Sequence, residues 1–133
     1  MKLLAHFLAD SANFNQDQTF TVFKGGITEV HSTGFPAMTK FVVVTSLVFD
    51  LAEAAKLHNM QLSLTLPDGR QVSGQRQPIA VRVMDATATR FYSNVIGQLN
   101  VGVDRPGEIV IAGEIDGDRL PLLHLVIRRV EVI

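Results

Sequence analysis

Four histidines are the side chains in this sequence best suited to metal binding or to general acid–base chemistry. No two of them have the spacing that lets one helix or one strand aim both rings at the same ion. A His-x-His pair followed by a Glu, as in cupin-type sandwiches, is also missing. The four histidines are His6, His31, His58 and His124. His6 and His124 fall in the first and last expected strands, which could be neighbours, and we expect both to be ordinary sheet histidines with hydrogen-bonded ring nitrogens. We predict no metal site and no cofactor.

Carboxylates and hydroxyls give no stronger sign of catalysis. Asp116-Gly117-Asp118 superficially suggests a calcium loop, but the full loop spacing that ends in a bidentate Glu is absent. An Asp-Gly step between two β-rich runs instead favours a hairpin turn, and Asp68 is interpreted in the same way. No Ser lies in a Gly-x-Ser-x-Gly elbow. The sequence thus predicts a protein that is not an enzyme, and a metal-dependent enzyme that uses His6, His31 or His124 is the least favoured alternative.

Aromatic residues leave one binding hypothesis open. Most of the Phe residues fall at inward-alternating positions, and with no Trp in the chain we expect them to fill a core rather than to stack on sugars or bases. The alternative is a small-ligand or carbohydrate-binding site made by loops at one end of the domain. Its candidate residues are Phe35, Tyr92 and Asp104.

Composition narrows the class of partner. The 133 residues contain 12 Lys and Arg against 13 Asp and Glu, so a net charge of -1 argues against nucleic acid and against an acidic membrane surface as partners. Hydrophobic residues reach 47% and charged residues only 19%, which suggests additional burial between copies of the chain. With 0 Cys, the sequence excludes disulfides and thiolate sites, and it fits the cytoplasm. The apolar start of the chain imitates a signal peptide but is interrupted by His6.

Alternating apolar residues in short runs, each closed by Gly, Pro, Asn or Asp, predict one all-β domain over residues 1–133. We expect a two-sheet antiparallel sandwich, immunoglobulin-like or a related Greek key, with about eight strands. The turns include 10–13, Pro67-Asp68-Gly69-Arg70 and Arg105-Pro106-Gly107. The expected strands are 2–9, 19–24, 27–31, 38–49, 60–66, 71–72, 79–84, 88–103 with a break near Gly97, 108–115 and 120–132. Gly25-Gly26 is either a turn between 19–24 and 27–31 or a bulge within one strand.

Asp50-Leu51-Ala52-Glu53 predicts a short capping helix near 51–58. Asp50 can accept from free backbone N–H groups, and Glu53 is placed to complete a capping box. We expect this helix to close one end of the sandwich by burying Leu51, Ala54 and Leu57.

The runs 38–49 and 120–132 are apolar at both odd and even positions, which predicts burial on both faces. A domain of this size cannot cover both by itself. The leading hypothesis is therefore a non-catalytic interaction or assembly module that self-associates, or docks on a protein partner, through a sheet face or edge.

Several short segments resemble a known family. They are the opening Leu3-x-x-x-Phe7-Leu8-Ala9-Asp10, the Gly25-Gly26-Ile27-Thr28 step, Phe49-Asp50-Leu51-Ala52-Glu53, and Arg105-Pro106-Gly107 with Asp116-Gly117. Together they are similar to a family of small bacterial or bacteriophage β-proteins catalogued only as a domain of unknown function. The resemblance covers nearly the whole chain and implies an immunoglobulin-like or related sandwich in the cytoplasm. It brings no assigned activity and no functional residues.

Overall fold

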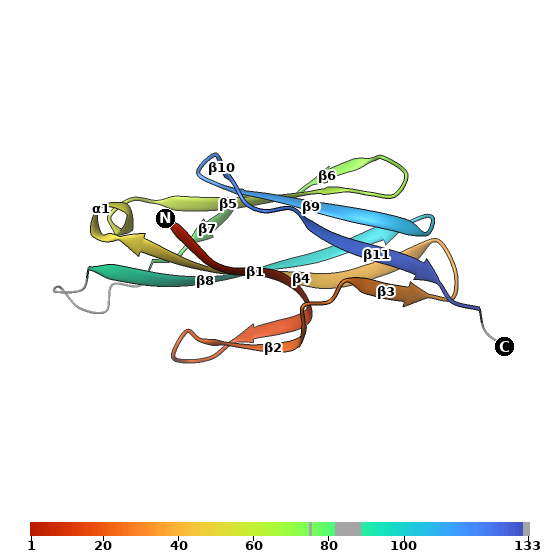
Figure 1. Ribbon diagram of the computed structural model, residues 1–133, viewed down its shortest axis with the longest axis horizontal. Coiled ribbons are helices and arrows are strands. Elements are labelled where there is room, and N and C mark those ends of the chain that lie inside the picture. The colour runs from red at the N-terminus through yellow and green to blue at the C-terminus, as the bar shows by residue number, and fades with distance from the viewer. Residues whose placement is uncertain (75, 82–88, 132–133) are drawn as a thin grey trace.

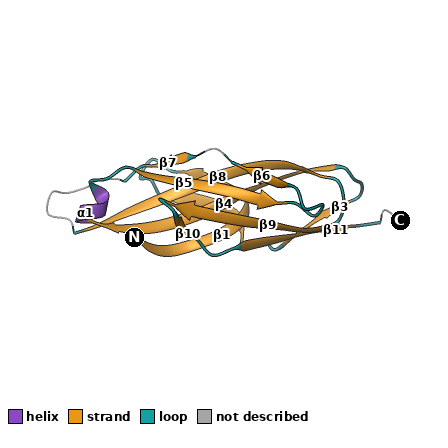
Figure 2. Ribbon diagram, turned by 90° about the horizontal axis from the view of Figure 1, so that it is seen from above, coloured by secondary structure: helices purple, strands orange, loops and turns teal. Residues whose placement is uncertain are grey.

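A computed structural model describes residues 1–74, 76–81 and 89–131 of the chain. These residues form eleven strands and one four-residue helix, and the strands lie in two facing sheets (Figures 1 and 2). The two-sheet, all-β sandwich that the sequence predicts is confirmed. No helix in this described part is long and apolar enough to cross a membrane.

The first sheet, sheet A, contains four antiparallel strands in the order β2-β1-β4-β8. Its strands are β1 (Lys2–Phe14), β2 (Phe20–Gly25), β4 (Ala37–Asp50) and β8 (Arg90–Val103). β4 and β8 pair along their whole length, from Ala37 opposite Val103 to Asp50 opposite Arg90. This ladder is the longest in the described chain and sets the long axis of the sandwich (Figure 1).

The second sheet, sheet B, has the order β3-β11-β9-β5-β6, with β7 also paired to β5 and β10 to β9. All of its pairs are antiparallel except β3 with β11, which run parallel. Its strands are β3 (Glu29–Ser32), β5 (His58–Thr65), β6 (Gln71–Ser73), β7 (Gln77–Ile79), β9 (Gly107–Ile115), β10 (Asp118–Arg119) and β11 (Leu123–Arg129).

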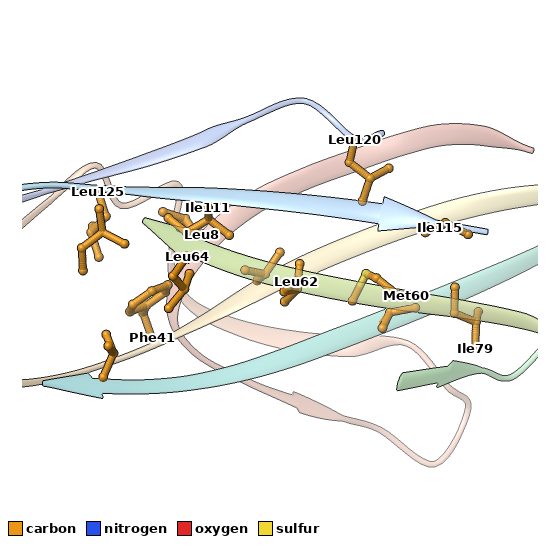
Figure 3. Close-up of a cluster of buried hydrophobic side chains, with 14 of the residues drawn as sticks. Leu8, Phe41, Met60, Leu62, Leu64, Ile79, Ile111, Ile115, Leu120 and Leu125 are labelled. Carbon is orange, nitrogen blue, oxygen red and sulfur yellow. The ribbon is translucent and has the colours of Figure 1, made fainter. Parts of the chain in front are cut away.

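Alternation along β5 shows how the sequence builds the core. Met60, Leu62 and Leu64 point inward and are buried, while the intervening polar side chains are partly exposed. Figure 3 shows these three residues between the sheets, with Phe41 of β4 and Ile111 of β9 in the same cluster. One continuous apolar core thus joins the two sheets.

Gly97 lies inside β8 and does not break it, so the predicted interruption there is wrong although the strand itself is confirmed. The residue pairs with Val43 of β4. A Cβ atom at position 97 would lie 2.7 Å from Leu62 Cδ1 of the opposite sheet. The absence of a side chain therefore serves close packing between the sheets and not a turn.

The predicted turn at residues 10–13 is also wrong, because β1 continues through it to Phe14. The strand changes partner at Ala9, which faces both Val42 of β4 and Gly25 of β2. Beyond this point β1 pairs with β2 to form a hairpin, which we call the β1–β2 hairpin and which lies on the side of β4 and β8 that faces away from sheet B (Figure 1).

The β1–β2 hairpin packs on the outer face of β4 and β8. Val42, Val44 and Ile96 of that face are buried in a second apolar cluster, to which the hairpin contributes Ala12 and Val22. Val44 is 0% exposed although it points away from the main core. The chain itself therefore covers the central part of the second apolar face that the sequence shows in 38–49, while Met38 at one end of it is 67% exposed.

The last strand, β11, is buried on one face only, so the predicted burial of both faces of 120–132 is wrong. Leu125 and Ile127 of β11 are buried, Val126 between them is partly exposed, and His124 and Arg128 on either side are exposed on the outer face. Position 132 of the expected strand 120–132, positions 82–84 of the expected strand 79–84 and position 88 of the expected strand 88–103 lie outside the described residues. The expected strand 79–84 is wrong for residues 80–81, because β7 ends at Ile79. Only the inner face of β11 contributes to the core.

Helix α1 (Leu51–Ala54) has the predicted capping box: the Glu53 N–H donates to Asp50 Oδ1 at 2.8 Å, and Glu53 Oε1 accepts from the Asp50 N–H at 3.1 Å. The predicted burial of its leucines is wrong. Leu51 is 60% exposed and Leu57 is 96% exposed, because the helix ends at Ala54 before a second turn can carry Leu57 to the core. Ala54 alone of the three packs against the core.

Candidate functional site

The edge of sheet A at β8 differs from every other sheet edge in the described chain. From Phe91 to Val103 the strand contains no charged residue and no Pro. The other outer strands are shorter. Three of them carry charge, Lys24 in β2, Glu29 in β3 and both residues of β10, while β6 and β7 have three residues each. Natural edge strands are usually protected by charge, by Pro or by short length. From Phe91 to Val103, β8 is protected by neither charge nor Pro, and it is not short.

The N-terminal half of the β8 edge has a neighbouring segment. Ser93 Oγ donates to the Ala80 carbonyl at 2.6 Å, and Gln77 Nε2 donates to the Ile96 carbonyl at 3.3 Å. These are side-chain contacts and not a strand ladder. From Gly97 to Val103, no strand of the described residues pairs with the outer side of β8. We call this segment, 97–103, the open edge.

Two hollows flank the open edge. One, of about 420 Å³, is lined by Gly97 and Leu99 on one side and by Leu62 on the other. The next, of about 370 Å³, lies against Val101 and includes Val72 of β6. One hollow lies beside each half of the open edge, and we call the two hollows together the groove.

Side chains along the open edge alternate between the core and solvent. Leu99, Val101 and Val103 pack against or within the main core, whereas Gln98 and Asn100 are exposed on the outer face. Across the groove, Arg70 hydrogen-bonds Asp68 through its backbone N–H at 3.0 Å and its Nε at 2.5 Å. The backbone hydrogen bond from Arg70 lowers the pKa of Asp68. The turn prediction for Asp68 is confirmed, and its charge is neutralised locally.

The structure does not bring together the three residues of the sequence-based ligand site. Phe35 precedes β4 and Asp104 follows β8, so the pairing of Ala37 with Val103 places both at the same end of sheet A. Phe35 lies under the Arg129 guanidinium, 5.3 Å from the ring centroid. Tyr92 lies inside β8, eleven residues before Val103, which at about 3.3 Å per residue is roughly 36 Å away.

Three of the histidines are separate from one another. His6 Nδ1 lies 2.9 Å from Thr45 Oγ1, and burial lowers the pKa of His6. A backbone hydrogen bond at Pro121 opposes this lowering of the pKa, although no acceptor or donor in the described part meets the buried Nε2 with good hydrogen-bond geometry. His124 contacts Glu108, and His31 lies 3.5 Å from Glu29. Strands β1 and β11 belong to different sheets, so His6 and His124 are not strand neighbours.

His58 forms the most constrained polar cluster. Its ring is buried and stacks on Phe49 with centroids 4.4 Å apart. Nδ1 faces the Asp116 carboxylate, while Nε2 lies 2.6 Å from the Glu53 carbonyl. Both nitrogens meet oxygen acceptors, so both are satisfied only when the ring is the doubly protonated imidazolium.

The electrostatics of this cluster agree with that protonation state. Burial opposes the charge on His58, but Asp116 and the Glu53 carbonyl outweigh it and raise the pKa of His58. Burial likewise opposes the charge on Asp116, and the hydrogen bonds from His58 and from the Asn59 N–H outweigh it and lower the pKa of Asp116. We call the pair the His58–Asp116 clamp. It fixes the α1–β5 connection to the β9–β10 turn and offers no ring nitrogen to a substrate.

Sequence reasoning missed the His58–Asp116 clamp. Asp116 was interpreted only as a hairpin residue, and that part is confirmed: it adopts φ 52° and Gly117 φ 87° between β9 and β10. Its partner is 58 residues away, and only the pairing of β5 with β9 brings the two together. Among the described residues no group of three His, Asp or Glu side chains could hold a metal ion.

These features define a β-sandwich domain with one long, uncharged and partly open sheet edge. Residues 4–128 match a family of unknown function (DUF6941), and the chain belongs to that family. Comparisons with curated proteins and with solved structures find no match.

Proposed function

We propose that this protein is a non-catalytic assembly module in which two copies associate by pairing their β8 strands along the open edge. The observation that carries the proposal is a 14-residue edge strand that has no charge and no Pro from Phe91 to Val103. An unprotected strand edge presents backbone donors and acceptors to a second strand, and the usual outcome is intermolecular pairing. The outward apolar face of β4 does not support self-association around Val42 and Val44, because the β1–β2 hairpin covers these residues.

A second copy is the occupant that the charge pattern favours. A neutral strand meets a neutral strand without repulsion, and the net charge of -1 adds no long-range barrier between copies. Antiparallel pairing of one segment with itself creates a two-fold interface, which closes at the dimer because it uses up the edge on both chains. The groove beside the open edge provides space for side chains of the added strand.

Sedimentation equilibrium or light scattering after size exclusion tests this proposal. The wild-type chain is expected to show a concentration-dependent dimer. A variant carrying Gln98→Lys and Asn100→Lys places like charges on the two facing strands, and each directly opposed pair costs about 0.2–1 kcal/mol. With two such pairs in the two-fold interface, the total is about 0.4–2 kcal/mol, so the dimer dissociation constant is expected to rise by about two- to thirtyfold.

The matched control carries Ser11→Lys and Asn13→Lys, which add the same charge at alternate exposed positions of β1. It is expected to dimerise like the wild type. A wild-type chain that stays monomeric at every concentration, or equal weakening by both double variants, contradicts the proposal. Circular dichroism of each variant confirms that the sheets are retained.

The strand order supports an immunoglobulin-like assignment, which we include in the proposal. In that fold the first, second and fifth strands share one sheet, and the third, sixth and seventh share the other. Here β1-β4-β8 and β11-β9-β5 occupy those places, with β6 beside β5. The bacterial or bacteriophage origin, the cytoplasmic location and the absence of enzymatic activity stay predictions from the sequence.

A further inference from the structure

The tip of the β1–β2 hairpin forms one wall of a cleft whose other wall is the N-terminal part of β8. The cleft has a volume of about 590 Å³, within the range of ~300–1,000 Å³ found for small-ligand pockets. It lies on the outer side of sheet A. Tyr92 is six residues before Gln98 in the same strand, which places the cleft roughly 20 Å from the first exposed position of the open edge.

Two exposed aromatic rings line this cleft, one on each wall. Phe14 is the last residue of β1 and is 53% exposed, while Tyr92 of β8 is 59% exposed. Its neighbour Phe91 is 2% exposed and fills the main core instead. Phe14 and Tyr92 therefore do not serve the packing of either apolar cluster. Their rings give the cleft two apolar surfaces that are open to a ligand.

The hairpin wall is held by its own hydrogen bonds. Asp17 Oδ1 accepts from the Thr19 N–H at 3.1 Å and from Thr19 Oγ1 at 2.5 Å. The Gln18 N–H donates to the Asn15 carbonyl at 3.0 Å, and Gln18 adopts φ 67°, a left-handed conformation that is uncommon for a residue other than Gly. Such a conformation persists where the surrounding contacts enforce it.

One side chain ties the two walls together. Asn94 of β8 donates from Nδ2 to the Gln18 carbonyl at 3.2 Å, and its Oδ1 accepts from Ser46 Oγ at 2.5 Å. The amide is thereby fixed on both sides. A ligand does not have to order the hairpin before it binds, because the spacing of the walls is already set.

The charges on the cleft wall limit the chemistry of the ligand. Of the described residues that line it, only Arg90 and Asp17 are charged, and their charges cancel. The remaining polar groups are amides, a hydroxyl and the Tyr92 phenol. Aromatic faces combined with neutral hydrogen-bonding groups suit a ring that has apolar C–H faces and a hydroxyl rim.

We propose that this cleft is a binding site for a neutral saccharide. Sugar rings lie against Phe14 and Tyr92, and the hydroxyl groups meet the polar side chains of the hairpin tip and Arg90. The site is independent of the dimer that we propose above, because its residues do not include the open edge.

Amide chemical-shift mapping by NMR and isothermal titration calorimetry test the site with maltotriose, cellotriose, xylotriose and N,N′,N″-triacetylchitotriose, with trigalacturonate as a charged probe. At least one neutral trisaccharide is expected to shift the amides of residues 14–19 and 90–94. Tyr92→Ala and Phe14→Ala are each expected to weaken its binding at least tenfold, while Tyr92→Phe retains most of the affinity because it keeps the ring. Leu57→Ala, at another exposed apolar position, leaves binding unchanged.

Several outcomes overturn the proposal. They are no response to any neutral trisaccharide at millimolar concentration, shifts located elsewhere on the protein, tighter binding of trigalacturonate, and unchanged affinity in both ring-deletion variants. The Gln98→Lys and Asn100→Lys variant separates the two proposals, since it is expected to bind the saccharide as well as the wild type does. Loss of the dimer alone leaves the cleft intact.

Discussion

Removing the charge of Asp116 is expected to destabilise the protein by an amount that depends on pH. In Asp116→Asn, the buried imidazolium of His58 loses its carboxylate but keeps the Glu53 carbonyl. A hydrogen bond to a charged group contributes about 1.5–3 kcal/mol. The Asp116 side chain is 38% exposed, so solvent screens the pair, and we expect a cost near the lower end, about 2 kcal/mol at pH 5.5.

The pH dependence follows from the two pKa directions. The pKa of His58 is raised above 6.5, so its stabilisation is complete below pH 6.5 and disappears as the pH rises through the folded-state value. The pKa of Asp116 is lowered below 3.8, so its stabilisation is present above that pH and is lost on acidification through the folded-state value. The His58–Asp116 clamp is therefore strongest between about pH 4 and 6.5.

Urea unfolding at about pH 5.5 and about pH 9 measures this effect. The cost of Asp116→Asn is expected to fall from about 2 kcal/mol to below about 1 kcal/mol as His58 loses its proton. In thermal melts the lower-pH cost corresponds to a decrease of roughly 6–10 °C for a domain of this size. Asp118→Asn makes the same charge change at an exposed position of the next strand and is expected to have little effect. An equal cost of Asp116→Asn at both pH values refutes the charged-histidine reasoning.

Two further predictions concern packing. Gly97→Ala is expected to cost about 1–3 kcal/mol because the new methyl group meets Leu62, and the Leu62→Ala background should remove most of that increment in a double-mutant cycle of unfolding free energies. Val44→Thr is expected to cost about 1–3 kcal/mol in urea unfolding, since the hydroxyl enters the dry contact under the β1–β2 hairpin; a solvated outer face would instead tolerate it.

The parts of the fold that depend on neighbouring residues could be predicted from the sequence. The capping box needs only Asp50 and Glu53, three residues apart, and the alternation of β5 reports its two faces directly. The Asp116-Gly117 turn is also local. In each case, the backbone conformation depends on side chains that are only a few residues away in the sequence.

The parts that depend on distant contacts could not be predicted in this way. Leu57 has the spacing of a buried helix position, yet whether α1 continues far enough to bury it depends on where β5 must begin. Residues 10–13 have turn composition, but pairing with β2 keeps them extended. The role of Gly97 is visible only when Leu62 of the other sheet is placed beside it. The candidate interaction surface shows the same limit: the sequence predicts association, which stays a prediction, but it does not indicate which sheet edge lacks a paired strand.

The long β4–β8 ladder affects how the chain can fold as it is synthesised. α1, β5, β6 and β7 all separate the two strands in sequence, so β4 leaves the ribosome well before its partner exists. Distant pairing of this kind is slow and leaves apolar surface exposed to aggregation. Strands β1 and β2 precede β4, however, and are already available to cover its outer face. In the nascent chain, the β1–β2 hairpin can therefore protect the outer face of β4 from aggregation before the strands that cover its inner face have been synthesised.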